Sequence, residues 1–323
     1  MYHCGNNELY TPKSRSNESP REHKSLLPFH LCALVAVTTW GASFISTKVL
    51  LQNGLNAVEI YLYRFLIAYL LTLILCPRPL MSHSWRDELK FALCGICGGS
   101  VYFIAENTAV QYTLVSNVSL IVATAPLITT LIVALLYKGE KLSKGLLIGS
   151  TIAFLGVACV IFNSSFVLSI KPFGDILSLL AAVCWAIYSL LLRSVSALYS
   201  AWFITRKTFF YGVVTALPFL FLESEFAPLS SFTRPEVYCN LLFLGMVCSM
   251  AAYLLWGLAV GKLGALKANN YLYLSPLATL ALSAWLLDEQ VSIIGYTGCA
   301  LILIGLIVGE RLGNNQPGSE PPK

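Results

Sequence analysis

Apolar runs of about twenty residues, separated by short polar segments, follow one another from Phe29 to Val308. A helix of about 20 apolar residues crosses the roughly 30 Å hydrocarbon core of a bilayer. Because backbone polar groups in lipid must be satisfied within the segment, the runs predict helices, and the alternation typical of barrel strands does not occur. The pattern predicts ten spans, at 29–49, 57–76, 89–110, 115–136, 145–163, 173–192, 202–222, 237–260, 267–286 and 291–309.

The order of proline, acidic and glycine residues that closes the first half recurs at the end of the second half. Pro126 and Pro276 are 150 residues apart, and the turn residues Glu140 and Glu289 are 149 apart. Each half holds an odd number of spans, so the second half enters the membrane inverted relative to the first. The sequence therefore predicts an all-α membrane protein with ten transmembrane helices arranged as two inverted five-helix repeats. The repeats cover 29–165 and 173–310, between polar tails at 1–28 and 311–323.

Lysine and arginine residues gather in one set of the predicted loops. With the amino-terminal tail in the cytoplasm, the inner segments hold fifteen of these residues and the outer segments hold three. Because cytoplasmic loops carry the basic excess, both termini are predicted to be cytoplasmic. The chain is 57% hydrophobic and only 11% charged, so its net charge of +5 does not indicate nucleic-acid binding. Its ten cysteines are scattered, which favours packing over a metal site or a disulfide framework.

Several motifs stand in a characteristic order. Trp40 and Gly41 fall near the end of the first span, a Pro–Glu–Gly pattern closes each half, and residues 102–121 read YFIAENTAVQYTLVSNVSLI. With these motifs the chain resembles the drug/metabolite transporter superfamily, specifically bacterial proteins with two EamA-type domains, over about residues 30–310. The resemblance implies a carrier in the bacterial inner membrane, with a central cavity lined by spans one, three, four, six, eight and nine. It also implies transport of small metabolites, often outward.

Charged residues inside the predicted spans are candidates for function, because ionisable groups are costly in a membrane. Arg64 and Glu106 lie at similar depths from the outer face, so they form either a structural ion pair or part of a functional site. In the second interpretation Glu106 changes its protonation, or Arg64 binds a substrate carboxylate. Arg206 and Lys207 lie toward the inner face, where they either extend to the cytoplasmic surface or bind an anionic substrate.

Polar and aromatic residues near the two prolines form a second set of candidates. Carboxamides hydrogen-bond to substrate groups, and aromatic faces accept flat or cationic groups. Such residues also join helices or lie at the membrane interface, so any single one has a structural explanation. As a set they predict a substrate site at Trp40, Tyr102, Asn107, Asn117, Tyr188, Tyr253, Trp256, Asn269, Asn270 and Tyr273, with Ser119, Trp185 and Tyr271 nearby. Pro126 and Pro276 add either hinges or fixed kinks.

Enzyme and ATPase motifs are missing from the sequence, which lacks HExxH, GxSxG and a P-loop. Together with the inverted repeat, this predicts a secondary transporter that works by alternating access without a cofactor or metal. That it moves a small organic metabolite, in the direction of export, is what the resemblance implies. An exchanger of nucleotide sugars or phosphate esters is the alternative within the superfamily, and a membrane enzyme or scaffold is a further one. Protons coupled through Glu106 and facilitated diffusion both stay open as energetic schemes.

Overall fold

The computed structural model describes residues 25–113, 118, 121–136, 144–161, 171–221, 223, 226–278, 281 and 292–314, and the regular structure in these ranges is helical throughout. Within these ranges five helices are long and apolar enough to cross a membrane: Leu27–Gln52, Ala57–Leu75, Trp85–Tyr112, Pro172–Ser196 and Pro235–Leu263. Lys144–Cys159 and Ile293–Gly309 are shorter apolar helices. The all-α membrane class is confirmed, whereas the count of ten spans stays a prediction.

The helices of the first half follow its apolar runs: α1 Leu27–Gln52, α2 Ala57–Leu75, α3 Trp85–Gly95, α4 Val101–Tyr112, α6 Ala125–Leu136 and α7 Lys144–Ile161. The start of α2 is set by a capping box. The Asn56 side chain accepts from the backbone N–H of Glu59 at 2.8 Å, and the Glu59 carboxylate accepts from the backbone N–H of Asn56 at 3.0 Å. This box fixes the first turn of the helix that carries Arg64.

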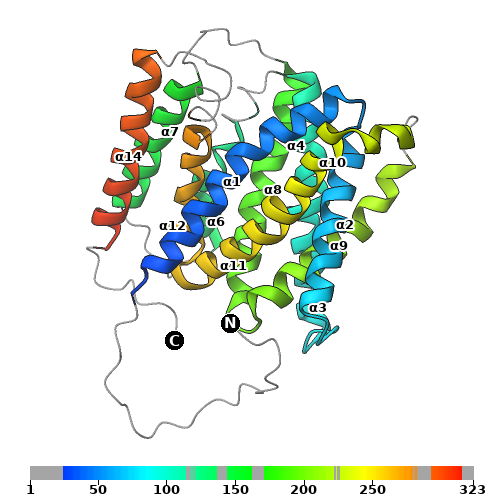
Figure 1. Ribbon diagram of the computed structural model, residues 1–323. Helices are drawn as coiled ribbons and strands as arrows, with labels where there is room; N and C mark the ends of the chain where they lie inside the picture. The colour runs from blue at the N-terminus through cyan, green and yellow to red at the C-terminus, as the bar shows by residue number, and fades with distance from the viewer. Residues whose placement is uncertain are drawn as a thin grey trace, which may run out of the picture.

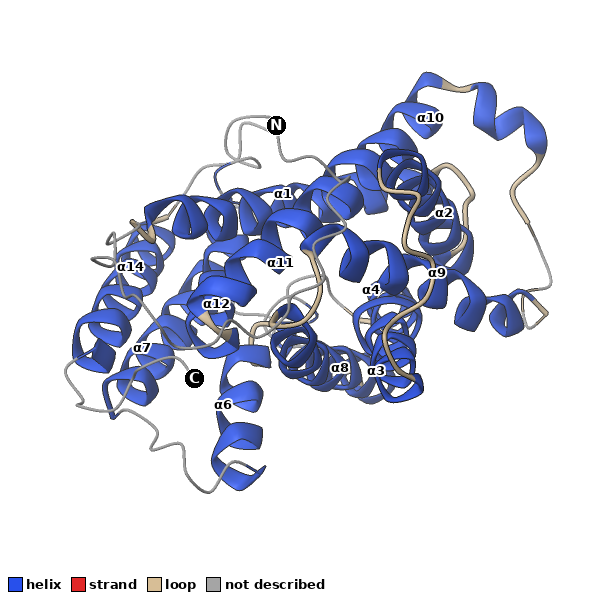
Figure 2. Ribbon diagram, turned by 90° about the horizontal axis from the view of Figure 1, so that it is seen from below, coloured by secondary structure: helices blue, strands red, loops and turns tan. Residues whose placement is uncertain are grey.

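The second half supplies α8 Pro172–Ser196, α9 Ala201–Leu220, α10 Pro235–Leu242, α11 Ala252–Leu263, α12 Ala265–Asn270 and α14 Ile293–Asn314. Helices of the two halves pack against one another rather than forming separate bundles. In Figures 1 and 2, α11 lies along α1 and α9 lies beside α2, and α4 also packs against α8. The hydrophobic core is therefore shared by both halves.

A π-helical segment interrupts one long helix in each half. Ile96–Ser100 joins α3 to α4, and Phe243–Ala251 joins α10 to α11. The hydroxyl of Tyr253 donates to the carbonyl oxygen of Gly98 at 2.6 Å, so the second half caps the irregular turn of the first. π-Helical segments within α-helices are frequent at functional sites, and both of these lie next to the central residues described below.

Pro126 and Pro276, which occupy equivalent positions in the two repeats, both lie where a helix is broken. Pro126 is the second residue of α6, directly after a turn at Ala123 and Thr124. Pro276 follows the 3₁₀ turn Tyr271–Tyr273, after α12 has ended at Asn270. The first turn of a helix tolerates proline because the backbone N–H of that position has no partner within the helix. The breaks agree with the predicted interruptions, and their role as hinges stays a prediction.

The last helices of the two halves, α7 and α14, lie side by side at one edge of the bundle (Figure 1). Glycines make this approach possible. A Cβ built on Gly149 would lie 2.5 Å from the carbonyl oxygen of Gly305, and one built on Gly156 would lie 2.7 Å from that of Gly298. The glycines that match across the repeat thus meet in one interface, as is typical of close helix pairs in membranes.

Arg206 and Lys207, near the start of α9, do not extend to the surface as the snorkelling interpretation expected. Both side chains are buried. The Arg206 guanidinium donates to the backbone carbonyls of Cys76 and Pro79. Lys207 Nζ lies 2.7 Å from Glu88 Oε2. The segment between α2 and α3 supplies these carbonyl acceptors, and this is why two cations are tolerated inside the protein.

Candidate functional site

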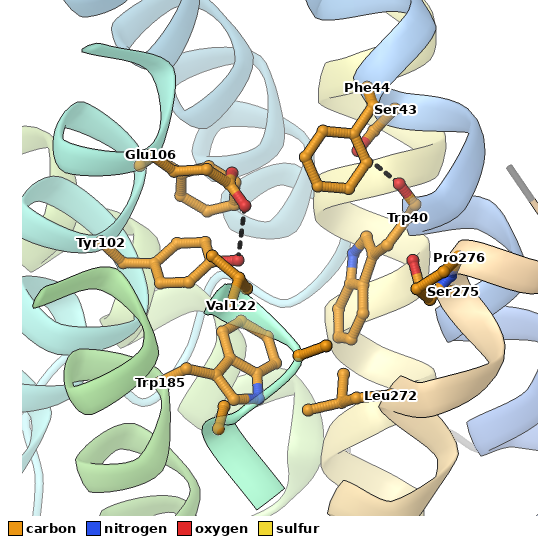
Figure 3. Close-up of a pocket in the computed structure, with 13 residues that line it drawn as sticks. Trp40, Ser43, Phe44, Tyr102, Glu106, Val122, Trp185, Leu272, Ser275 and Pro276 are labelled. Atoms are coloured by element: carbon orange, nitrogen blue, oxygen red, sulfur yellow. Dashed lines mark hydrogen bonds between the residues drawn. The ribbon is translucent and has the colours of Figure 1, made fainter. Parts of the chain in front are cut away.

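A cavity of about 70 Å³ lies at the centre of the bundle, between the two halves (Figure 3). Residues of α1, α4 and α8 form its sides, and the segments around the two helix breaks close it. Its lining is mostly aromatic and aliphatic, with one carboxylate: Trp40, Ser43, Phe44, Tyr102, Phe103, Glu106, Val122, Ala123, Ala125, Trp185, Leu272, Ser275 and Pro276.

The cavity lies where equivalent parts of the two repeats meet. Val122 and Leu272 both line it, and they occupy equivalent positions 150 residues apart. The same holds for Ala125 and Ser275. Both broken helices therefore contribute the same short stretch to one space. A site built from discontinuous helices at a repeat interface is typical of secondary transporters.

Indole and phenol rings form most of the cavity wall. Trp40 and Trp185 meet edge to face, with ring centroids 5.0 Å apart, and Tyr102 lies 5.2 Å from Trp185. The Trp40 indole N–H donates to the carbonyl oxygen of Cys248 at 2.9 Å, which fixes the orientation of that ring. The indole N–H of Trp185 is buried and has no hydrogen-bond partner within the described ranges.

Glu106 is the only carboxylate among the described lining residues. Its side chain is buried, and its Oε1 accepts a hydrogen bond from the Tyr102 hydroxyl at 2.8 Å (Figure 3). Tyr102 stands one helical turn earlier on α4, so the helix itself brings phenol and carboxylate together. A carboxylate held at the edge of an aromatic cavity suits a ligand with an ammonium group.

Arg64 and Glu106 do not form the ion pair that their depths suggested. The described part of the chain shows no salt bridge within 4.0 Å between them. The Arg64 Nε instead donates to Ser249 Oγ at 2.9 Å, and its Cζ lies 4.4 Å from the centre of the Phe103 ring. Arg64 is not part of the cavity lining, although the ring it contacts is.

Several predicted site residues pack against the residues that line the cavity but do not line it themselves. Tyr188, Tyr253 and Trp256 pack around Trp185, with ring centroids 5.3, 6.3 and 6.0 Å away. The Asn107 carboxamide donates to the carbonyl oxygen of Ala57 at 3.3 Å and so joins α4 to α2. These four residues are buried and do not line the cavity.

The asparagines of α12 also hold helices together. Asn269 Nδ2 donates to Thr129 Oγ1 of α6 at 2.7 Å, and Asn269 Oδ1 accepts from Ser189 Oγ of α8 at 3.0 Å. Asn270 Oδ1 accepts from Ser150 Oγ of α7 at 3.1 Å. In this structure the two carboxamides therefore serve as helix junctions beside the cavity.

Three other predicted site residues lie elsewhere. Tyr273 is fully buried next to the second helix break. Lys207 is engaged by Glu88 and does not line the cavity. Asn117, like Ser119, lies outside the described residues.

The cavity also contains residues that the sequence did not single out: Ser43, Phe44, Phe103, Val122, Ala123, Ala125, Leu272 and Ser275. Most of them are apolar and carry no chemical signal of their own. The internal repeat is the one feature of the sequence that points to some of them, because the positions just before Pro126 are equivalent to those just before Pro276. Among the described residues, no group of three or more His, Cys, Asp or Glu side chains is arranged to hold a metal ion.

Known proteins resemble this chain in sequence and in fold. An uncharacterized transporter of Archaeoglobus fulgidus is 28% identical, over 86% of this chain and 95% of that protein. A probable terminal-alkyne amino-acid exporter of Streptantibioticus cattleyicolor is 26% identical, over 89% and 96%. A probable amino-acid metabolite efflux pump of Escherichia coli is 23% identical, over 85% and 92%.

A solved crystal structure superposes with a TM-score of 0.71 over 88% of this chain and 98% of that one, at 17% identity, which shows a shared fold. The EamA-like transporter family matches residues 27–162 and residues 172–309. Both repeats deduced from the sequence are therefore repeats of one family. The chain belongs to the EamA-like transporter family, and it is an integral membrane transporter of that kind.

Proposed function

We propose that the protein is a secondary carrier that exports a small organic metabolite across a bacterial inner membrane by alternating access. Its two halves contribute five spans each in opposite orientation, and both termini lie in the cytoplasm. The observation that carries the proposal is the cavity between the halves, where equivalent residues before Pro126 and Pro276 face one space. Rocking of one repeat against the other opens such a site to either side in turn.

An amino-acid-related metabolite is the substrate class we propose. Two relatives are named as an exporter of terminal-alkyne amino acids and as an efflux pump for amino-acid metabolites. The cavity offers the matching chemistry for an ammonium group, because Glu106 supplies a negative charge and Trp40 and Trp185 supply indole faces.

The exchanger of nucleotide sugars or phosphate esters is less well supported. Phosphate groups are bound by clusters of arginine and lysine, which supply several charge-assisted hydrogen bonds. The described lining contains no lysine or arginine, and Lys207 is engaged by Glu88. An exporter of small, positively charged or zwitterionic metabolites fits this lining better.

Efflux measurements test the proposal. Cells with and without the protein are loaded with labelled amino acids, and the medium is followed by mass spectrometry. Trp185→Ala removes one wall of the cavity, and we expect it to lower the efflux rate about tenfold at equal abundance in the membrane. Trp85→Ala is the matched control, because this indole is 81% exposed at the start of α3. Equal losses in both variants, or no efflux by the wild type, would contradict the proposal.

A further inference from the structure

Arg64 is a buried cation whose hydrogen-bonding capacity is only partly used. The side chain is 1% exposed. Its Nε donates to Ser249 Oγ at 2.9 Å, whereas its Nη2 is buried and has no hydrogen-bond partner within the described ranges. The same part of the chain holds no salt bridge to Arg64 within 4.0 Å. The charge of Glu106 acts on Arg64, but in the part of the chain that the structure describes the two groups make no direct ion pair. A buried guanidinium with an unused donor is costly, so the position suits a ligand that brings an anionic group to it.

Phe103 connects this arginine to the cavity. Its ring lines the cavity, and the Arg64 Cζ lies 4.4 Å from the ring centroid. The ring also packs against Tyr102, Phe65 and Tyr61, with centroids 4.8, 5.4 and 5.8 Å away. Phe103 is thus the side chain that stands between the guanidinium and the cavity, and a movement of its ring would connect the two.

The cavity as it stands is small for a transport site. Its volume is about 70 Å³, whereas pockets that hold drug-sized ligands have about 300–1,000 Å³. Further space for a substrate has to come from a neighbouring side chain. Phe103 is such a side chain, and it separates the cavity from Arg64.

We propose that Arg64 is an anion subsite of the transport site, which binds the carboxylate of the transported molecule when the Phe103 ring moves aside. Glu106 then binds the ammonium group, so the site selects zwitterionic molecules over simple amines and simple acids. A guanidinium suits a carboxylate because it donates two parallel hydrogen bonds. This inference rests on the proposed function, and it deepens it by naming which charged group of the substrate meets which residue.

Matched probes separate the two charges. L-Alanine carries both charges, propionate is L-alanine without its amino group, and ethylamine is L-alanine without its carboxylate. We expect the purified wild-type protein to bind L-alanine about tenfold or more tightly than either partial probe in calorimetric titrations. Arg64→Gln should remove the advantage of L-alanine over ethylamine and abolish propionate binding, while ethylamine binding is retained. Glu106→Gln should show the opposite pattern.

A second variant covers the case in which Arg64→Gln does not fold. Phe103→Leu shortens the covering side chain, and we expect it to tighten propionate binding severalfold at unchanged ethylamine affinity. Unchanged propionate binding in Phe103→Leu would overturn the subsite. Equal losses of L-alanine and ethylamine in Arg64→Gln would show a structural arginine. If none of the three probes binds the wild type, the zwitterion site is wrong, whereas the efflux measurement separately decides whether the protein is a carrier.

Discussion

Single residues inside the bundle show how a membrane protein keeps polar groups where lipid surrounds it. Glu106 accepts a hydrogen bond from the Tyr102 hydroxyl, and Lys207 contacts the Glu88 carboxylate and the backbone carbonyl of Leu80. The Lys207 partners come from α3 and from the segment between α2 and α3, so the charges also tie elements together. We expect the loss of Glu106 to affect transport and the loss of Lys207 to affect stability.

Glu106→Gln tests whether protons take part in transport. Glu106 is the carboxylate of the described cavity lining, and the charged or titratable groups that face it are Tyr102, Arg64 and Tyr253. In a proton-coupled carrier this group changes charge as access alternates, so the glutamine variant should lose the pH dependence of transport but keep exchange down a substrate gradient. Transport by reconstituted vesicles at pH 5.5 to 8.5 measures this. A variant with the wild-type pH profile would make Glu106 structural and the protein a facilitator.

Lys207→Gln tests the buried ion pair. The side chains of Lys207 and Glu88 are 6% and 5% exposed, and Tyr211 and Ser82 add hydrogen bonds to the carboxylate. Removal of one buried partner leaves the other charge uncompensated, so we expect a loss of about 3 kcal/mol in unfolding free energy. Lys90→Gln is the control, because the Lys90 side chain is 36% exposed in its pair with Asp87 and should cost less than about 1 kcal/mol. Denaturation in detergent measures both, and similar losses would contradict the assignment.

At the scale of elements, the helix breaks lie at the candidate site, and the close contact between α7 and α14 joins the two halves. The segments before Pro126 and Pro276 turn away from regular helix at the cavity, so short apolar side chains line it from both halves. α12 then bonds to α6, α8 and α7 through two consecutive asparagines. These hydrogen bonds join α12 to three neighbouring helices, and the role of the breaks as hinges stays a prediction.

Gly149→Ala tests the pairing of α7 with α14. The added methyl group would lie 2.5 Å from backbone atoms of α14, so the helices must separate and lose contact along their length. We expect a clear drop in thermal stability, equivalent to about 2 kcal/mol. Gly257→Ala is the matched control, because its nearest neighbour would be at an ordinary 3.6 Å and alanine favours helix. A loss of stability in the control alone would contradict the packing argument.

At the scale of the whole molecule, the two halves form one bundle whose core and cavity belong to both. The cavity draws on α1 and α4 from the first half and on α8 from the second, and the Trp40–Trp185 contact crosses between them. Neither half alone encloses the site. In secondary transporters, inverted repeats let one shared site open to opposite faces in turn, and this is the arrangement proposed above.

Cysteine labelling tests the inverted topology. Lys144 begins α7, and Ser292 directly precedes α14 at the equivalent place in the second half. We expect Lys144→Cys to react with a membrane-impermeant maleimide only in inside-out vesicles, and Ser292→Cys only in intact cells. The exposed Cys239 is replaced first to remove background labelling. Labelling of both positions from the same side would contradict two inverted repeats.

The sequence by itself determined the membrane class and the repeat, and it pointed to several residues of the candidate site, because apolar length, charge and residue order along the chain are local properties. Span length follows from bilayer thickness, and the matching prolines show the duplication without any contact between them. These arguments placed Trp40, Tyr102, Glu106 and Pro276, which all line the cavity.

Only the tertiary structure decided how these residues are partnered. Arg64 and Glu106 share a depth, but depth does not fix the direction of a side chain around a helix, and Arg64 turns to Ser249 and Phe103 instead. Asn269 and Asn270 carry the chemistry of a ligand site, yet serines and a threonine from three other helices take up their hydrogen bonds. Those partners are 80 to 140 residues away in the chain, so no local pattern reveals them, and packing of both halves alone determines which polar groups remain for a substrate.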